Sequence, residues 1–478
     1  MASRRDQFQS YQFMVRRVIS SFVLHETDPA QPPLRRMTGA ALGSVMVAVI
    51  VLAVAGVIGV FKPSGNANWM DGGHIIIEKS TGAHYMWMQD QASGSWYLYP
   101  ITNFASAALL AGSTDTTYVS TKQLMGVPRG PRLGLGDAPD SIPTTNHLLG
   151  VPWTLCSLPA ETISGERVPN TALALGRQRT SGIPVGDSAM LARDIERGTL
   201  HLVWHGHDYP IPDEAPVLEG LTMRDVPQVQ VGTAWLSALP AGKPLAVPVA
   251  PGRGQHTDVL PGGATVGEVR VVQSGGGTQY YLVQKQRIQA ITPVQAAITL
   301  ADPSVRQLVY GGNNPVPRPL PAAVANSVPR LNTPAVDPTD PPAVKPSMAA
   351  VNSDQSTVCA SFHNAGLVPE VAFEAAVEGA EVAPATEQRT QNGTVLANRV
   401  EVQPGWGAVV ESMPSPTATS GSLFLVTDDG RRYAIANGDA RDALGYSPVT
   451  PVQMPASLVA RIPAGDALDP QAAHQRRS

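Results

Sequence analysis

An uncharged, apolar run at residues 37–61 constrains this chain more than any other feature. It reads MTGAALGSVMVAVIVLAVAGVIGVF, with Arg35 and Arg36 before it and Lys62 after it. A helix of these 25 residues is about 37 Å long, enough to cross a hydrocarbon core of about 30 Å with some tilt. Helices buried in the core of a soluble domain are rarely as long. We therefore expect one transmembrane helix over 37–61, and no other stretch qualifies.

Two features indicate that this helix is retained rather than removed as a signal peptide. The apolar run exceeds the roughly 7–15 residues of a signal-peptide core, and no clear A-x-A cleavage site follows it. The flanking charges predict its orientation, because residues 1–36 hold six arginines against three acidic residues. Of the 34 basic and 38 acidic residues in the chain, 28 and 35 lie beyond residue 61. The positive-inside rule then places the N-terminus in the cytoplasm and residues 62–478 outside the cell membrane.

The cytoplasmic segment contains an apolar stripe at helical spacing. Its members recur at intervals of three, four, three and four residues, which places them on one face of a helix: Phe8, Tyr11, Val15, Val18 and Phe22. Such a helix either rests on the inner leaflet, with Arg16 and Arg17 near anionic headgroups, or docks on the groove of a partner. The pattern alone leaves both interpretations open.

Segments of the outer region resemble one another in pairs. Residues 198–211 (GTLHLVWHGHDYPI) and 421–435 (GSLFLVTDDGRRYAI) each read as a strand, a polar turn and a second strand. Residues 97–112 and 284–302 each read as a strand that leads into an alanine-rich helix, with Thr102 and Thr292 as expected N-caps. Upstream of these, the expected strand pairs lie at 74–88 and 268–283.

A third pair of similar segments surrounds the two cysteines. WTLCSLPAE around Cys156 resembles STVCASFHN around Cys359, and similar glycine-containing segments follow at Gly186 and Gly405. The order of unit, cysteine strand and unit thus occurs twice, which indicates an ancestral doubling. If the halves are related by a twofold axis, the two cysteines meet near it and form a disulfide in the oxidising outer compartment. Two buried free thiols are the alternative.

These patterns predict a single-pass membrane protein with a mainly β, α+β ectodomain. Its expected parts are a central β domain and four small β-α repeat units, arranged by pseudo-twofold internal duplication. The boundaries we expect are a cytoplasmic segment with an amphipathic helix at 1–36, a transmembrane helix at 37–61, repeat 1 and a linker at 62–149, the first part of the central domain at 150–197, repeat 2 at 198–262, repeat 3 at 263–312, a proline-rich extended segment at 313–354, the second part of the central domain at 355–420, repeat 4 at 421–468 and a flexible tail at 469–478.

The motifs that suggest chemistry have simpler structural interpretations. His201, His205 and His207 stand beside Asp208, but the similar segment 421–435 lacks histidine, which favours a turn that happens to be rich in histidine. The GDS at 186–188 suggests an esterase nucleophile, yet its counterpart reads GWG, which indicates a backbone need for glycine. In GHIIIEKS (73–80), Glu78 stands where a phosphate loop needs glycine, so the string reads as a strand.

We therefore nominate no catalytic residue, cofactor or metal ligand. A net charge of −4 gives no reason to expect binding to nucleic acid. Two cysteines are too few for a zinc site made of four thiolates.

The SYQFMVRR helix, the single span ending in VFKP, the two distant cysteines and the four small repeats together resemble the EccB family. This family is the single-pass core component of the type VII (ESX) secretion system. The resemblance covers nearly the whole chain and lies in the order and spacing of the motifs. It implies an ectodomain of four repeats around a central β domain, with repeats similar to the cell-wall-binding module of a phage lysin. It also implies self-association and support of the export channel.

The resemblance implies partners as well: an EccC-like ATPase, EccD-like and EccE-like membrane subunits, and membrane lipid. Some members of the family carry an ATPase attribution, but this sequence contains no Walker A or Walker B motif, and we expect a structural subunit without catalysis. Two alternatives stay open. One is an anchored protein that binds cell wall, which the 5% aromatic content disfavours because sugar-binding platforms usually need exposed aromatic rings. The other is a nucleotide hydrolase with no recognisable motif.

Overall fold

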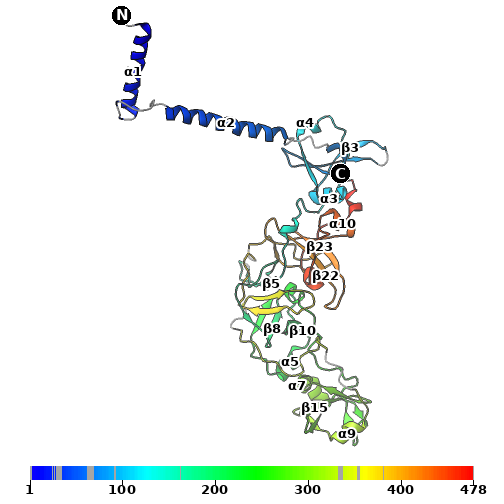
Figure 1. Ribbon diagram of the computed structural model, residues 1–478. Coiled ribbons are helices and arrows are strands. Elements are labelled where there is room, and N and C mark those ends of the chain that lie inside the picture. Colours follow the sequence, from blue (N-terminus) through cyan, green and yellow to red (C-terminus); the bar gives the residue numbers. More distant parts are fainter. Residues whose placement is uncertain are drawn as a thin grey trace. The chain divides into compact units, whose positions relative to one another are not determined.

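A computed structural model describes residues 3–23, 25, 27, 35–61, 69–90, 93–161, 163–168, 170–331, 337–351, 356–379 and 382–476 (Figure 1). The chain divides into two compact units, Met1–Met70 and Asp71–Ser478. The first unit is helical, and the second combines several small sheets with short helices, so the protein is of mixed α/β class.

The first unit contains two long helices, α1 (Arg4–Val23) and α2 (Arg35–Phe61). The window Thr38–Ala55 of α2 is long and apolar enough to cross a membrane, and none of it is buried within the protein. A run of exposed valine, isoleucine and leucine side chains is stable only in an apolar solvent. The predicted helix over 37–61 is confirmed, and it fits a single membrane span. A short helix, η1 (Trp69–Asp71), lies where the two units meet in sequence.

Four sheets of the second unit share one strand order. In each sheet the first strand pairs antiparallel with the second, the second pairs antiparallel with the third, and a fourth strand returns parallel to the first. A parallel return needs a crossover connection, and a helix supplies it in every case.

The bounds of these elements follow in chain order. The first sheet consists of β1 (Ile75–Glu78), β2 (His84–Gln89), β3 (Trp96–Pro100) and β4 (Thr116–Val119), with α3 (Phe104–Ala111) and α4 (Thr121–Leu124). The second consists of β8 (Ala189–Asp194), β9 (Leu200–Trp204), β10 (His207–Ile211) and β11 (Gln228–Val231), with α5 (Glu214–Gly220) and α6 (Thr233–Leu236). The third consists of β14 (Val269–Ser274), β15 (Gly277–Val283), β16 (Ile288–Ile291), β17 (Arg318–Pro319) and a fifth strand, β18 (Arg330–Leu331), with α7 (Pro293–Ala301), α8 (Pro303–Leu308) and α9 (Ala322–Ser327). The fourth consists of β22 (Ala408–Met413), β23 (Ser422–Val426), β24 (Arg432–Ala434) and β25 (Val452–Pro455), with α10 (Gly438–Ala443) and α11 (Ala456–Val459).

A fifth sheet combines strands from two distant parts of the chain. Its order is β21-β6-β5-β19-β20-β7. The strands are β5 (Trp153–Ser157), β6 (Thr171–Ala174), β7 (Ile183–Pro184), β19 (Val358–Phe362), β20 (Glu370–Phe373) and β21 (Arg399–Glu401). Every residue of β5 and β19 is buried, which makes this central sheet the core of the second unit. The turn η2 (Thr145–His147) precedes it, and the short pair β12 (His256–Thr257) and β13 (Ala264–Thr265) precedes the third sheet.

Hydrophobic clusters join the sheets to one another. One cluster combines side chains of the central sheet, such as Trp153 and Phe362, with side chains of the second and fourth sheets. Another combines the first and fourth sheets, and Tyr446 donates a hydrogen bond of 2.7 Å to the carbonyl oxygen of Pro143 within it. The first and fourth sheets therefore share a core although more than 250 residues separate them in the sequence.

The strand pairing corrects two expected boundaries of the central domain, and it places β17 and β18, beyond the expected end of repeat 3 at residue 312, in the third sheet. β8 and β22 are the first strands of the second and fourth sheets, whereas the boundaries at 197/198 and 420/421 assign them to the central domain. The error arises because the visible sequence similarity begins at the following hairpin, and the partner of an isolated strand depends on contacts far away in the sequence.

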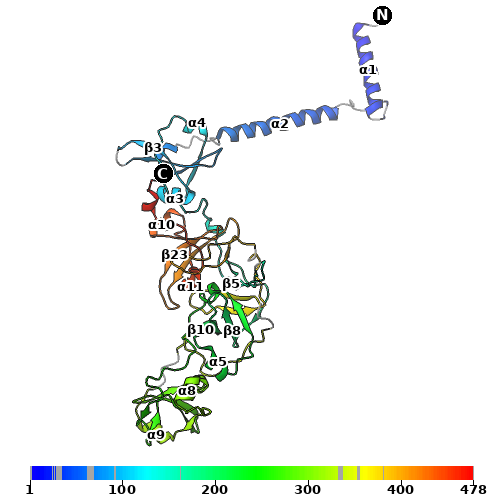
Figure 2. The same cartoon turned by 180° about the vertical axis from the view of Figure 1, so that it is seen from behind.

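Two segments expected to be irregular contain regular structure. The proline-rich segment includes β17, α9 and β18, since prolines at a strand edge or just before a helix are compatible with both elements. The tail contains α12 (Pro470–Ala473), which packs on α3 with Ala473 fully buried, as Figures 1 and 2 show at the chain's C-terminus. The sequence predicted a flexible tail, but residues 470–473 form a packed helix.

Of the two expected helix caps, Thr292 is confirmed and Thr102 is wrong. Thr292 caps α7. Its hydroxyl oxygen accepts a hydrogen bond from the Gln295 backbone amide, and the Gln295 side-chain oxygen accepts one from the Thr292 backbone amide. α3 instead begins after Asn103, whose side chain accepts a hydrogen bond from the Ser106 amide. Thr102 is not the cap because its hydroxyl donates to the carbonyl oxygen of Leu135.

Candidate functional site

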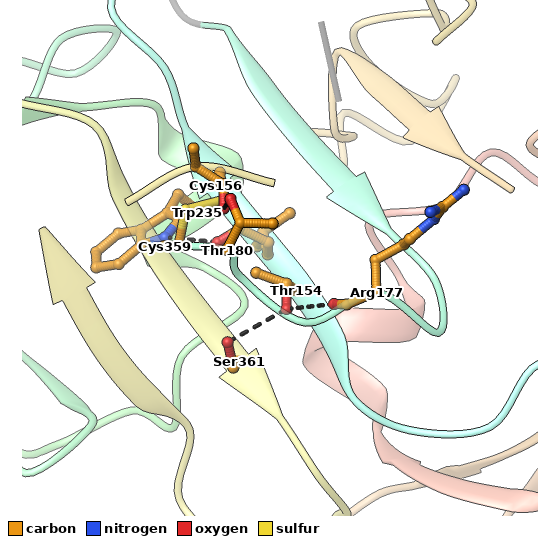
Figure 3. The surroundings of a disulfide bond; sticks show 9 residues. Thr154, Cys156, Arg177, Thr180, Trp235, Cys359 and Ser361 are labelled. Carbon is orange, nitrogen blue, oxygen red and sulfur yellow. Dashed lines mark hydrogen bonds between the residues drawn. A yellow bond between two sulfur atoms is a disulfide. The ribbon is translucent and has the colours of Figure 1, made fainter. Parts of the chain in front are cut away.

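A disulfide bond lies at the centre of the central sheet. Cys156 of β5 and Cys359 of β19 are directly opposite each other in the antiparallel register, with Cα atoms 4.0 Å apart and a sulfur–sulfur distance of 2.03 Å (Figure 3). Both side chains are fully buried. The bond joins residues 203 positions apart, and the disulfide expected from the sequence is therefore present.

Small side chains surround the disulfide on its face of the sheet. Ala172 lies opposite Cys156 on β6, and Ala372 lies opposite Cys359 on β20. On the same face, Thr154 donates a hydrogen bond of 2.8 Å to the carbonyl oxygen of Arg177, and its oxygen lies 3.2 Å from that of Ser361 (Figure 3). Alanine and hydroxyl side chains leave room for two sulfur atoms, and reduction would require this face to open.

Large side chains pack on the opposite face. Trp235 of α6 is fully buried, and its indole nitrogen donates a hydrogen bond of 3.1 Å to the carbonyl oxygen of Leu155 on β5 (Figure 3). Trp153 and Phe362, which are opposite each other in the register, complete this layer. The disulfide thus connects two strands that also share a large hydrophobic core.

The predicted apolar stripe lies on α1. Phe8, Tyr11, Val18 and Phe22 are between 55% and 80% exposed, and Val15 is 37% exposed. The exposed apolar surface is wider than predicted, because Phe13 and Met14 are also exposed. Sequence reasoning omitted these two because they fall outside the strict spacing of three and four. Whether the stripe binds lipid or a partner stays a prediction.

The three histidines of the second sheet have separate partners. His201 lies between Asp208 and Thr199, at 2.7 Å from the carboxylate oxygen and 2.9 Å from the hydroxyl. The ring of His205 stacks on Trp204 with centroids 4.0 Å apart, whereas His207 lies 3.0 Å from the carbonyl oxygen of His205 through its Nδ1 atom. Across the residues that the structure describes, no three His, Cys, Asp or Glu side chains are placed to hold a metal ion.

The fourth sheet shows what the His201–Asp208 pair does. Leu202 lies opposite Tyr209, and Leu425 lies opposite Tyr433. By this register Phe424 and Arg432 occupy the positions of His201 and Asp208, and the Arg432 guanidinium lies 4.9 Å from the centroid of the Phe424 ring. Because a different attractive pair occupies the same position, the histidine and aspartate hold two strands together.

The other two motifs also have structural roles. Gly186 and Gly405 precede β8 and β22 with φ of 57° and 76°, a backbone conformation that favours glycine. The string at 73–80 forms β1 and the following turn, as predicted. Glu78 is buried there and accepts hydrogen bonds from the Thr121 hydroxyl at 2.6 Å and from the Thr81 amide at 2.7 Å. These hydrogen bonds, with further ones from Ser80, hold the pKa of Glu78 far below its usual range.

A comparison with protein families identifies the chain. The family described as "Type VII secretion system ESX-1, transport TM domain B" matches residues 1–478. The chain belongs to the EccB family. Its anchor helix, disulfide-linked sheet and four peripheral sheets are therefore features of an EccB protein.

Curated EccB proteins are similar over almost the whole chain. The "ESX-3 secretion system ATPase EccB3" of Mycolicibacterium smegmatis is 29% identical over 484 residues, which cover 97% of this chain and 89% of the relative. The "ESX-2 secretion system ATPase EccB2" of Mycobacterium tuberculosis is 28% identical over 493 residues, which cover 98% of this chain and 94% of the relative.

Solved EccB structures agree with the fold. A chain in the "intact ESX-5 inner membrane complex" matches with a TM-score of 0.58 and 25% identity, covering all of this chain and 96% of the other. The "EccB3 dimer from the ESX-3 core complex" matches with a TM-score of 0.53 and 25% identity, covering 84% of this chain and all of the other. The chain is accordingly a core membrane subunit of a type VII secretion system.

Proposed function

We propose that this EccB protein is a structural subunit whose α2 anchors it in the membrane and whose ectodomain self-associates to support the export channel. The observation that carries the proposal is the central sheet, closed by the Cys156–Cys359 bond between strands 203 residues apart. A subunit that transmits or resists force needs a core that does not separate. The solved dimer of a related EccB protein supports self-association of this chain.

The strand order of the central sheet supports a rigid body. β7 comes from the first half of the ectodomain but pairs with β20 of the second half, and β21 of the second half pairs with β6 of the first. Each half therefore contributes a strand to the far edge of the other half. Separating the halves would break three strand pairings and a covalent bond, which suits a scaffold.

We infer that the four peripheral sheets arose by duplication, and three tyrosines support this. Tyr99, Tyr209 and Tyr433 lie on the third strand of the first, second and fourth sheets, opposite Met86, Leu202 and Leu425. Each ring packs against a glycine that lies 31 to 33 positions later, where a Cβ atom would overlap the ring: Gly130, Gly242 and Gly465.

The tyrosine sites share further properties. Each tyrosine is buried, and each hydroxyl donates to an oxygen: Tyr99 to Asp90, Tyr209 to the carbonyl of Pro338, and Tyr433 to Asp429. Burial raises the pKa of Tyr209 to about 12. In the third sheet, Gln289 stands at the tyrosine position opposite Leu282, and Leu331 of β18 pairs with it. In the third sheet the smaller Gln289 thus replaces the tyrosine, and the larger Leu331 replaces the glycine that the tyrosine ring contacts in the other sheets.

The central sheet is consistent with a twofold relation through the disulfide. Leu155 lies opposite Ala360, and Ser157 lies opposite Val358. A twofold rotation about the Cys156–Cys359 pair places each strand on the other and turns the first of these residue pairs into the second. We therefore assign each half one cysteine strand and two peripheral sheets.

We further propose that α1 lies in the cytoplasm, that the second unit is extracytoplasmic, and that the partners are EccC-like, EccD-like and EccE-like subunits. The excess of arginine ahead of α2 supports this topology. The chain should be extracted in mild detergent together with a motor ATPase as one native complex. Protease added to protoplasts should digest the second unit and spare α1. Migration as a free chain under every mild condition would refute the subunit assignment, and the reverse digestion pattern would refute the topology.

The names of the relatives, which describe them as ATPases, favour a second candidate, nucleotide hydrolysis. In this chain the string closest to a phosphate loop is β1, and Glu78 binds the hydroxyls of its own turn. Hydrolysis that survives purification of the full chain and is lost on a single surface substitution would establish this activity. Loss of hydrolysis when the motor ATPase is removed would assign it to that partner.

A further inference from the structure

Two stacked tryptophans lie on the face of the first sheet. Trp87 of β2 and Trp96 of β3 are diagonal neighbours across the antiparallel pair, with centroids 5.9 Å apart and planes 19° apart. Trp96 is 43% exposed, whereas Trp153 and Trp235 are fully buried. A stacked pair with one exposed and one partly buried tryptophan is costly in water because each ring carries a large apolar surface. Burial in this protein's own core does not explain it.

The chain enters the second unit directly beside this pair. A Cβ atom on Gly72 would lie 3.7 Å from Cζ3 of Trp96 and 3.7 Å from the carbonyl oxygen of Trp87. Gly72 follows the end of α2 at Phe61 by eleven residues. Even a fully extended chain of that length spans only about 40 Å. The chain therefore cannot place Gly72 more than about 40 Å from the end of α2.

A cation extends the aromatic surface. Tyr85 precedes Trp87 by two residues and shares its face of β2, and the guanidinium of Arg129 lies 5.1 Å from the centroid of the Tyr85 ring. Arg129 is exposed. A guanidinium beside aromatic rings binds phosphate and tolerates an interface that is partly apolar.

The charge of this part of the ectodomain suits an anionic surface. Residues 71–135 contain four basic and four acidic side chains, whereas residues 136–478 contain 23 basic and 31 acidic side chains. Glu78 is buried and Asp90 binds Tyr99, so the exposed charges are Lys79, Lys122, Arg129 and Arg132 against Asp71 and Asp115. Residues 71–135 thus expose a net positive charge, whereas residues 136–478 carry a net negative charge in total.

We propose that this aromatic-basic surface, defined as Tyr85, Trp87, Trp96 and Arg129, contacts the lipid headgroup region of the membrane that α2 crosses. Tryptophan and tyrosine favour the headgroup region because their rings are apolar and their N–H and O–H groups are polar. The contact adds a second attachment to the anchor and limits rotation of the first sheet about it. The proposal rests on α2 as the membrane anchor and needs no particular topology or partner.

Fluorescence quenching by lipid tests the proposal. The full chain is placed in lipid nanodiscs with and without a phospholipid that carries a nitroxide on its headgroup, and the tryptophan intensity lost to the nitroxide is measured. Three of the seven tryptophans, Trp69, Trp87 and Trp96, lie near the anchor in sequence. In W87F/W96F the quenched intensity should fall at least about twofold, because both rings of the proposed surface are removed and Trp69 is buried.

Matched variants separate this result from other causes. W204F removes a partly exposed tryptophan of the second sheet and should leave the quenched intensity unchanged. An equal quenched intensity in W87F/W96F and the parent chain would overturn the proposal. So would a parent chain without any quenching, which would mean that a second copy or another subunit covers the surface instead of lipid. If the double variant does not fold, W96F alone decides, because Trp96 is exposed and its replacement leaves the buried core intact.

Discussion

Gly220 at the end of α5 lies against the backbone of Ala297 in α7, where a Cβ atom would come within 2.6 Å of the Ala297 carbonyl oxygen. This contact joins the second and third sheets through their helices, because α5 and α7 pack along each other. Because the neighbour is backbone, it cannot move aside as a flexible side chain would. Glycine at this position therefore determines how closely the two helices pack.

Gly220→Ala should destabilise the protein by about 1–3 kcal/mol, the usual cost of an overfilled site. The matched control is Gly438→Ala in α10, where nothing lies within 4 Å of a Cβ atom, so stability should stay the same or rise slightly. Thermal unfolding of the two variants in detergent measures the difference. Equal midpoints for both would show that the helices can separate at no cost.

Removal of the disulfide should destabilise the second unit without unfolding it. Closing a loop of 203 residues restricts the unfolded chain, and a loss of about 3–5 kcal/mol is expected for C156A/C359A. Denaturant unfolding of the oxidised parent, the reduced parent and the double variant measures this loss. The reduced parent and the variant should behave alike, and a parent unaffected by reductant after full unfolding and refolding would contradict the expectation.

Acid should remove the stabilising effect of Glu78. Its hydrogen bonds from Thr121, Thr81 and Ser80 lower its pKa in the folded protein below the value in the unfolded chain. The unfolded protein thus takes up a proton first as the pH falls, and the contribution of Glu78 is complete above about pH 4.5 and declines below it. The difference between the unfolding midpoints of the parent and E78Q should be largest at pH 7, begin to shrink below about pH 4.5, and keep shrinking as the pH falls toward the lowered pKa of folded Glu78. A difference independent of pH would contradict this ionic role.

Substitution of the α1 stripe should weaken an interaction rather than the fold. Phe8, Val15 and Phe22 contact solvent over 37% to 80% of their surface, so serine at all three should leave thermal stability unchanged. Loss of three apolar contacts should lower the yield of native complex at least about tenfold, since 1.4 kcal/mol corresponds to that factor. Serine at Gln7, Gln9 and Gln12 is the matched control. An unchanged complex with reduced binding to vesicles would assign the stripe to lipid.

Local patterns predicted several elements well. The run at 37–61 forms α2, the segments at 198–211 and 421–435 form hairpins, and Thr292 caps α7. Each of these depends on neighbours a few residues away, so composition and spacing are sufficient. The cysteine pairing was also accessible, because similar sequences surround Cys156 and Cys359 and symmetry places similar strands together.

Features that depend on distant contacts were missed. The residues around Ala189 do not indicate that β8 pairs with β11 rather than with a strand of the central sheet. Ala473 belongs to a polar tail, yet α3 supplies the surface that buries it. Asn103 and Thr102 are both competent caps, and the carbonyl of Leu135, which binds Thr102, decides between them.

By itself the sequence determined that residues 37–61 form a helix apolar enough to cross a membrane, that hairpins form at 198–211 and 421–435, and that similar sequences surround the two cysteines. These properties follow from hydrophobicity and local backbone preference, which act over a few residues. Tertiary structure alone decided which strands share a sheet, that β7 pairs with β20 and β21 with β6, and that Trp87 and Trp96 stack on each other. Strand pairing and side-chain burial are set by surfaces that meet only after the chain has folded.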